Sequence, residues 1–285
     1  MITVNSISGG KTSAYIAAHY PADYNVFALV RTTDKKCIFP DHKIRQIISD
    51  KLGVEFIGTL EQDEIIYTIL DLEQFIGQKI DWVTGRPFDD IIKRTGGRKF
   101  LPNPLMRFCT IEMKLEPIKN WWRKTINEPF VCRIGFRANE QRRANNMLSK
   151  TADDGYLYEK FEIGQNKIYK KWQLVKYEKP VFPLIENNIY KDTIEKYWKG
   201  KPVRFAYMNN CVGCFHRTPI VLKKMQTKEP NKFQWFIDAE DDNGYTGING
   251  GFKNGIKYKD IATWNLQTEL FDDDFNECDS GYCGI

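Results

Sequence analysis

The sequence predicts an α/β protein with a parallel, Rossmann-like sheet that carries helices on both faces. Three observations indicate this fold. The first half of the chain alternates short apolar runs with amphipathic stretches, which is the order of strands and crossover helices in a parallel sheet. The first apolar run passes through a glycine-rich turn directly into a helical pattern. With 285 residues, of which 42% are hydrophobic, the chain can also bury a substantial core.

Each expected element follows from its local pattern. Strands are expected where apolar residues cluster in short runs, and helices where they recur at spacings of three and four. The expected strands are 2–7, 24–31, 54–57 and 130–136. The expected helices are 14–19, 42–52, 61–75, 110–124, 140–148 and 191–197. Pro117 should kink or break the fourth of these helices. Residues 85–103 mix glycine, proline and basic residues, as in loops around a short helix.

Composition limits the function classes. The net charge of +5 permits a nucleotide or nucleic-acid partner without pointing to either. No stretch approaches the roughly 20 apolar residues of a membrane helix, and no charged leader or long apolar run precedes Ser8. We therefore expect a cytoplasmic protein with no membrane partner, whose assembly into a homo-oligomer stays open.

The turn at residues 8–13 reads SGGKTS and lies between the first expected strand and helix. Glycines allow close backbone approach, and a helix N-terminus offers free N–H groups, so this arrangement suits a phosphate group. Gly10, Lys11 and Thr12 fit the end of a Walker loop, but its first glycine would fall at Asn5. We expect a phosphate site of another kind, and the alternative is a glycine-rich turn without a ligand.

The SGGKTS turn resembles the S-G-G-x-[DT]-S pyrophosphate loop of the adenine nucleotide alpha-hydrolase superfamily. That superfamily includes ATP pyrophosphatases, tRNA-thiolating enzymes, and PAPS and APS reductases, and many of its members carry Asp at the place of Thr12. The resemblance implies that ATP or a related adenine nucleotide binds with Mg²⁺ and is cleaved at the alpha phosphate. It implies phosphate binding by Ser8, Gly9, Gly10, Thr12 and Ser13. Lys11 would be the catalytic residue that neutralises the leaving pyrophosphate.

Further motifs agree with the PAPS/APS reductase-like branch in their order along the chain. The stretch CTIEMKLEPI at 109–118 resembles the C-C-x-x-x-K-x-x-P-[LM] segment of APS reductases, with Thr110 in place of the second cysteine. The stretch GFRANEQRR at 135–143 resembles G-x-R-x-x-E-S-x-x-R, and VFPLI at 181–185 resembles the strand entry before a helix. Arg137 is therefore expected to meet phosphate, whereas Arg142 and Arg143 fit a solvated helix face equally well. Arg94, Arg98 and Lys99 could form a basic flap, although a solvated loop is the commoner outcome.

Seven cysteines in a chain expected to be cytoplasmic point to thiols or metal ligands rather than to disulfides. The C-x-x-C pair Cys211 and Cys214 can direct two thiolates to one metal centre. We expect Cys109 as the third ligand and Cys283 as the fourth, with Cys278 and His216 as alternatives. Cysteine spacing does not separate iron from zinc, and a redox pair is another interpretation. The resemblance favours a [4Fe-4S] cluster. We expect the remaining cysteines, Cys37 and Cys132, to be buried thiols.

These observations lead to three hypotheses about function. The first is a PAPS reductase-like enzyme that binds a small-molecule nucleotide, releases pyrophosphate from ATP and activates an acceptor for a step such as thiolation. The sequence does not identify this acceptor, and a nucleic acid is one candidate. The second is a true PAPS or APS reductase, in which Cys278 is the nucleophile. The third is a nucleotide-binding protein without catalysis.

We divide the chain near Ile185 into a nucleotide-binding α/β domain at 1–185 and a cysteine-rich region at 186–285 packed on it. The tryptophans are scattered, so we expect most of them to pack in the core or at its edge, and we expect no base-stacking platform.

Overall fold

In the computed structural model, five strands form a parallel sheet in the order β3-β2-β1-β4-β7. The structure describes residues 1–93, 99–166, 169–241 and 250–265. The strands of this sheet are β1 (Thr3–Ile7), β2 (Tyr24–Leu29), β3 (Ile80–Thr84), β4 (Phe130–Arg133) and β7 (Glu178–Val181). Strand β1 lies at the centre, where Val4 aligns with Tyr24 of β2 and with Cys132 of β4. The parallel α/β sheet expected from the sequence is confirmed.

The helices expected along the first half are present with small changes at their ends. They are α1 (Lys11–His19), α2 (His42–Leu52), α3 (Glu64–Ile76), α4 (Phe88–Ile91), α5 (Phe108–Thr110), α6 (Glu116–Thr125) and α7 (Gln141–Leu148). The later helices are α8 (Pro183–Glu186), α9 (Lys191–Trp198), α10 (Pro219–Lys228), α11 (Pro230–Asp241) and α12 (Tyr258–Thr263). Short 3-10 turns lie at Lys35–Cys37 and Ala138–Glu140. No helix in the described part of the chain combines the length and the apolar character that a membrane crossing needs.

Backbone contacts divide the chain into two units that interleave along the sequence. The first unit comprises residues 1–27, 69–81 and 121–204, and the second comprises 28–68, 82–120 and 205–285. Strands β1, β4 and β7 belong wholly to the first unit. A large apolar cluster in the second unit includes Leu222 of α10, Phe233 and Phe236 of α11, and Tyr258 of α12, all nearly inaccessible to solvent. Burial of each such side chain contributes about 1.5 to 3 kcal/mol, so these helices have a core of their own. The boundary predicted near Ile185 remains a prediction.

The prediction of a strand at 54–57 was wrong. Val54 is exposed there, and the chain next to it forms only isolated bridges, from Gly58 to Thr32 and to Ile38. The third strand of the first half is instead β3, Ile80–Thr84, which lies at the edge of the sheet beside β2. Ile80 and Trp82 of this strand are buried, whereas Asp81 and Val83 between and after them are half-buried, which suits an edge strand with one face covered.

The expected break at Pro117 takes the form of a π-helical turn. Residues Ile111–Leu115 form this turn between α5 and α6. Proline has no N–H to donate and its ring collides with the carbonyl of the fourth preceding residue, here Met113, so a regular α-helix cannot run through this point. The widened turn therefore lies directly between Cys109 and Pro117, within the stretch that resembles the APS reductase motif.

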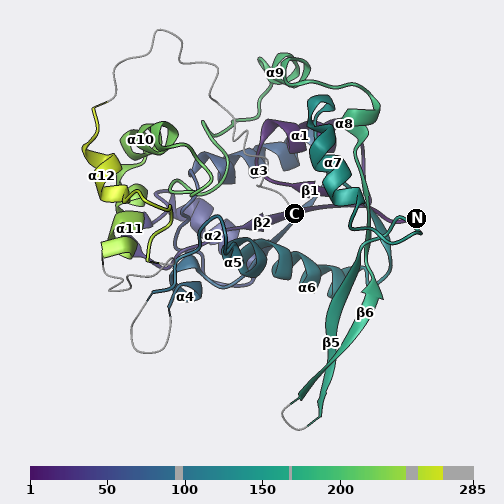
Figure 1. Cartoon of the computed structure of the whole chain (residues 1–285). Coiled ribbons are helices and arrows are strands. Elements are labelled where there is room, and N and C mark those ends of the chain that lie inside the picture. The colour runs from purple at the N-terminus through teal and green to yellow at the C-terminus, as the bar shows by residue number, and fades with distance from the viewer. Residues whose placement is uncertain (94–98, 167–168, 242–249, 266–285) are drawn as a thin grey trace. The chain divides into compact units, whose positions relative to one another are not determined.

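An antiparallel ribbon of two strands was missed at the sequence level. Strands β5 (Tyr158–Asn166) and β6 (Tyr169–Lys176) pair along their length, with a register shift between Glu162 and Gly164 (Figure 1). The sequence signal for this ribbon is the alternation of aromatic, aliphatic and charged residues after Gly155. The ribbon also exposes Trp172, which is an exception to the packing role expected of most tryptophans.

Candidate functional site

The SGGKTS turn connects β1 to α1 within the first unit. Gly9 has a φ of 78°, a left-handed conformation that glycine adopts without strain. Gly10 is the N-cap of α1, and no side chain caps this helix. The first turn of an α-helix leaves its N–H groups without intrahelical acceptors. In this loop those groups are consequently suited to an anion.

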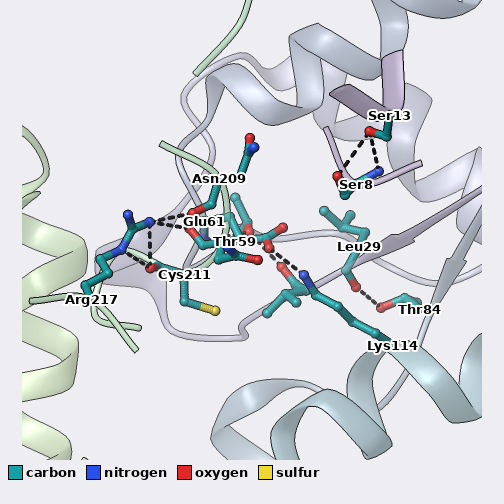
Figure 2. Close-up of polar contacts among 12 residues, drawn as sticks. Ser8, Ser13, Leu29, Thr59, Glu61, Thr84, Lys114, Asn209, Cys211 and Arg217 are labelled. Atoms are coloured by element: carbon teal, nitrogen blue, oxygen red, sulfur yellow. Dashed lines mark hydrogen bonds and ion pairs between the residues drawn. The ribbon is translucent and has the colours of Figure 1, made fainter. Parts of the chain in front are cut away.

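Two serines fix the shape of this turn. The Ser13 hydroxyl accepts a hydrogen bond from the Ser8 backbone N–H at 3.0 Å and lies 3.1 Å from the Ser8 hydroxyl (Figure 2). It also donates to the Gly10 carbonyl at 3.1 Å. Both serine hydroxyls thus stabilise the loop itself, whereas the motif resemblance implies that they bind phosphate. The main-chain N–H groups and the Thr12 hydroxyl are the groups of this loop that could donate hydrogen bonds to a phosphate more directly.

Asn5 shows why a Walker loop cannot form here. It lies inside β1, where its amide nitrogen donates to Asn25 of β2 and to the Tyr20 carbonyl at the end of α1, each at 3.0 Å. The position that a Walker loop reserves for glycine is therefore a buried hydrogen-bonding residue of the central strand.

Lys11 forms an ion pair with Glu195 of α9. Trp198 of the same helix donates from its indole Nε1 to the Lys11 carbonyl at 2.9 Å. Lys11 therefore already has an anionic partner, and a phosphate group that approaches it must compete with Glu195. Sequence reasoning did not identify Glu195, because 184 residues separate the two partners and no local pattern links them.

Arg137 follows β4 but is directed to another protein group. It is only 7% exposed, and its Nε donates to the Glu140 carboxylate at 3.0 Å. Burial opposes ionisation of Glu140, yet the Arg137 backbone N–H, its guanidinium and Arg143 together lower the Glu140 pKa below its usual value. Arg143 also lies over the Phe136 ring at 4.2 Å. The expected role of Arg137 in phosphate binding therefore stays a prediction, and its observed partner is Glu140.

The C-x-x-C turn belongs to the second unit, and its backbone is held by several side chains. The Arg217 guanidinium donates to the carbonyls of Asn209, Asn210 and Cys211 (Figure 2). The buried Tyr258 hydroxyl donates to the Gly213 carbonyl at 3.0 Å. These hydrogen bonds fix the backbone of the loop that joins the two cysteines, and they tie it to the core of this unit.

The structure brings Cys109 close enough to this turn for the thiols to influence one another. Burial raises the pKa of the Cys109 thiol to about 11, and the charge of Cys214 contributes to the shift. Burial is also the main cause of the raised pKa of Cys211. The charge of Glu61 raises this pKa further, and the charges of Cys214 and Cys109 raise it more weakly. Protonated thiols are poor nucleophiles, so these shifts do not favour a thioredoxin-like redox role. A bound metal ion would displace the protons.

Lys114 and Glu61 form an ion pair beside these cysteines. The Lys114 Nζ lies 3.1 Å from Glu61 Oε1 (Figure 2). Glu61 is almost fully buried, and its Oε2 accepts no hydrogen bond from any residue that the structure describes. A buried carboxylate oxygen that accepts no hydrogen bond lowers the free energy of unfolding. Glu61 is therefore held at a cost in stability, or its site lacks a hydrogen-bond donor. The sequence motif pointed to Lys114 but not to Glu61.

The other cysteines fall into two groups. Cys37 and Cys132 are buried free thiols, as predicted. Cys278 and Cys283, like Arg94 and Arg98, lie outside the described residues. Within the described ranges, no group of three or more His, Cys, Asp or Glu side chains is placed so that it could hold a metal ion. The metal site expected at Cys109, Cys211, Cys214 and Cys283 therefore remains a prediction.

No protein-family model, no curated protein and no solved structure matches this chain. The interpretation of both regions consequently depends on the chemistry of their residues and on the motif resemblance.

Proposed function

We propose that the protein binds an adenine nucleotide, such as ATP with Mg²⁺, at the SGGKTS turn and cleaves it at the alpha phosphate. The observation that carries this proposal is the uncapped N-terminus of α1 after the left-handed Gly9. A loop of this shape binds phosphate through its main chain. Because Asn5 occupies the Walker glycine position within β1, the loop fits the pyrophosphatase type better than the Walker type.

In this reaction an oxygen of the acceptor forms a new bond to the alpha phosphorus. The bond from that phosphorus to the bridging oxygen breaks, and pyrophosphate leaves with its charge balanced by Lys11 and Mg²⁺. Lys11 would have to exchange Glu195 for phosphate as the nucleotide binds. The acceptor would then carry an adenylyl group, which activates it for attack by a second nucleophile such as a sulfur donor.

We also propose that Cys109, Cys211 and Cys214 hold a metal centre, with the terminal Cys283 as fourth ligand. Three thiols that influence one another, two of them on a backbone fixed by Arg217 and Tyr258, form a soft donor set. Thiolates of this kind bind [4Fe-4S] clusters or zinc. Such a centre would supply local stability, because metal binding and local folding are coupled. In the same proposal the C-terminal region is a cysteine-rich appendage to a doubly wound α/β domain.

Two alternatives give different products. A PAPS or APS reductase would release sulfite through a Cys278 nucleophile, and a nucleotide-binding protein without catalysis would show affinity without turnover. The test is to incubate anaerobically purified protein with ATP, PAPS or APS and to identify the products. From ATP and an acceptor we expect pyrophosphate and an adenylylated acceptor, and we expect AMP once a second nucleophile attacks that acceptor. Direct formation of ADP and orthophosphate without AMP would reject the proposal.

The binding step is tested separately by calorimetry. Lys11→Ala should weaken ATP binding by about 1 to 3 kcal/mol, as expected for the loss of one charge-assisted contact. Lys196→Ala, which removes an exposed lysine from α9, is the matched control and should bind like the unmodified protein. Equal ATP affinity in all three proteins would place the nucleotide elsewhere.

A further inference from the structure

Strands β5 and β6, which we call the ribbon, expose an unusual number of large apolar side chains. Exposed fractions of about one half or more are found for Ile163, Tyr169, Trp172 and Leu174. Exposed apolar clusters of this kind mark interaction sites in soluble proteins. Packing within its own unit therefore does not explain the exposed apolar side chains of the ribbon.

The charges of the ribbon are arranged by sign. Among its described residues, every charged side chain in the exposed class is a lysine: Lys160, Lys170 and Lys171. Both glutamates are half-buried. Glu162 is paired with Lys170 at 2.8 Å. The solvent-facing surface thus combines aromatic rings with an excess of positive charge, and the Glu162 carboxylate, whose side chain is 37% exposed, is neutralised by Lys170.

The two faces of the ribbon have different surroundings. Phe161 is buried against Trp122 of α6, with ring centroids 5.0 Å apart, and Arg123 donates to the Glu162 carbonyl at 2.8 Å. The register places Trp172 opposite Glu162 and Leu174 opposite Lys160. Because side chains alternate between faces along a strand, Trp172, Leu174 and Lys160 share the face opposite to Phe161. Lys171 lies on the face of Phe161, whereas Lys170, two residues before Trp172, lies on the same face as Trp172.

We propose that this face of the ribbon binds a single-stranded segment of nucleic acid. An exposed aromatic ring can stack on an unpaired base whatever its sequence, and neighbouring lysines can neutralise phosphates. Trp172, at 57% exposure, is the stacking residue. Lys170, whose Nζ lies 5.9 Å from the centre of the Trp172 ring, and Lys160 contact the backbone. Unpaired bases are required because bases within a duplex do not offer their faces.

The charge pattern favours this partner over a second copy of the chain. In a two-fold contact the same surface meets itself, so Lys160 and Lys170 of one copy would face lysines of the other. A polyanion removes that repulsion. The inference depends on the ribbon alone and does not require the proposed nucleotide chemistry.

The test measures binding of fluorescein-labelled single-stranded RNA and DNA oligonucleotides, each of about 20 nucleotides, which exceeds the usual contact length. The complete protein is titrated into each probe, and anisotropy is recorded at several salt concentrations. We expect binding that weakens with salt. Trp172→Ala should reduce affinity roughly tenfold, and Lys160→Glu with Lys170→Glu should flatten the salt dependence. Tyr190→Ala and Lys43→Glu, which alter exposed residues outside the ribbon, are the matched controls.

Several results would overturn the proposal. They are the absence of binding to both probes at micromolar protein, equal affinity of the Trp172→Ala variant and the unmodified protein, and an equal loss in the control variants. Stronger binding of the same sequence as a duplex would also contradict a stacking role. Sedimentation of the same proteins gives a further readout. If Trp172→Ala dissociates an oligomer and leaves probe affinity unchanged, the face is an interface between copies.

Discussion

Glu195 changes the expected chemistry of Lys11, since the ion pair between them occupies the cation that a phosphate group would contact. Both side chains are about one third exposed, so the pair is weak enough for a nucleotide to displace. In the nucleotide complex that we propose, the Glu195 carboxylate would repel phosphate and so reduce the affinity for the nucleotide.

Replacement of Glu195 by Gln should consequently strengthen nucleotide binding, by roughly fivefold, which corresponds to about 1 kcal/mol for a partly exposed pair. Calorimetric titration with ATP measures the change. Asp192→Asn removes an exposed carboxylate from the same helix and should have a smaller effect. Weaker binding in Glu195→Gln would mean that Glu195 positions Lys11 rather than competes for it.

The pair formed by Glu61 and Lys114 is mostly shielded from water, with side-chain exposures of 3% and 28%. Glu61→Ala should lower the free energy of unfolding by about 3 kcal/mol, because it leaves the lysine without its carboxylate. Glu61→Ala combined with Lys114→Met should be less destabilised than Glu61→Ala alone. Urea denaturation measures both, and Lys259→Ala, which breaks an exposed pair with Asp241, should cost less than about 1 kcal/mol. A double variant that is destabilised more than Glu61→Ala would contradict this coupling between the two side chains.

Cys37 gives a prediction that depends on pH. Burial raises the pKa of its thiol to about 12, so the reactive thiolate forms in the native protein only as the pH approaches that value. Iodoacetamide at pH 8 should modify Cys37 far more slowly in the folded protein than in urea, and the native rate should rise with pH. Peptide mass spectrometry measures the modified fraction. Rapid native modification at pH 8 would show that this thiol is not buried as described.

At the scale of elements, the C-x-x-C turn depends on a close approach between Gly213 and α11. A Cβ atom on Gly213 would fall inside the contact distance of the Phe236 ring. Phe236 is itself part of the core cluster, which leaves the ring little freedom to move. A shift of the C-x-x-C turn toward α11 would therefore require α11 to move as well.

Gly213→Ala should destabilise the protein by about 1 to 3 kcal/mol, the usual cost of overpacking, and should reduce metal content if the proposed centre is present. Gly213→Ala with Phe236→Leu should recover part of that loss, because the smaller side chain makes room. Thermal unfolding and metal analysis of the three proteins provide the measurement. An unchanged midpoint in Gly213→Ala would show that the turn can move away from α11.

At the scale of the whole molecule, the division into two units predicts a local response to metal removal. Metal binding and local folding are coupled, so chelation, or Cys211→Ser, should lower amide protection around α11 and α12. Strands β1, β4 and β7 belong to the other unit and should keep their protection. Hydrogen exchange measured by mass spectrometry distinguishes these regions, with Cys37→Ser as a control that keeps the metal. Uniform loss of protection, or no iron and no zinc in the purified protein, would contradict this prediction.

The sequence alone was sufficient for those features that depend on neighbouring residues. The alternation of apolar runs predicted the parallel sheet, and the turn before Lys11 predicted the strand-loop-helix connection, because both patterns are local. The same local reasoning failed at 54–57 and at β3, where short mixed runs are equally compatible with strand and loop. It also overlooked the ribbon, whose pairing joins residues of two separate runs.

Only the tertiary structure decided which partner each functional side chain meets. Lys11 contacts Glu195, Arg137 contacts Glu140, and Lys114 contacts Glu61. Two of these three pairs join distant parts of the chain, and folding alone brings their charges together. A sequence motif specifies the chemical type of a residue and its place on an element. The charges that surround it depend on packing between elements, so they are determined when the chain folds.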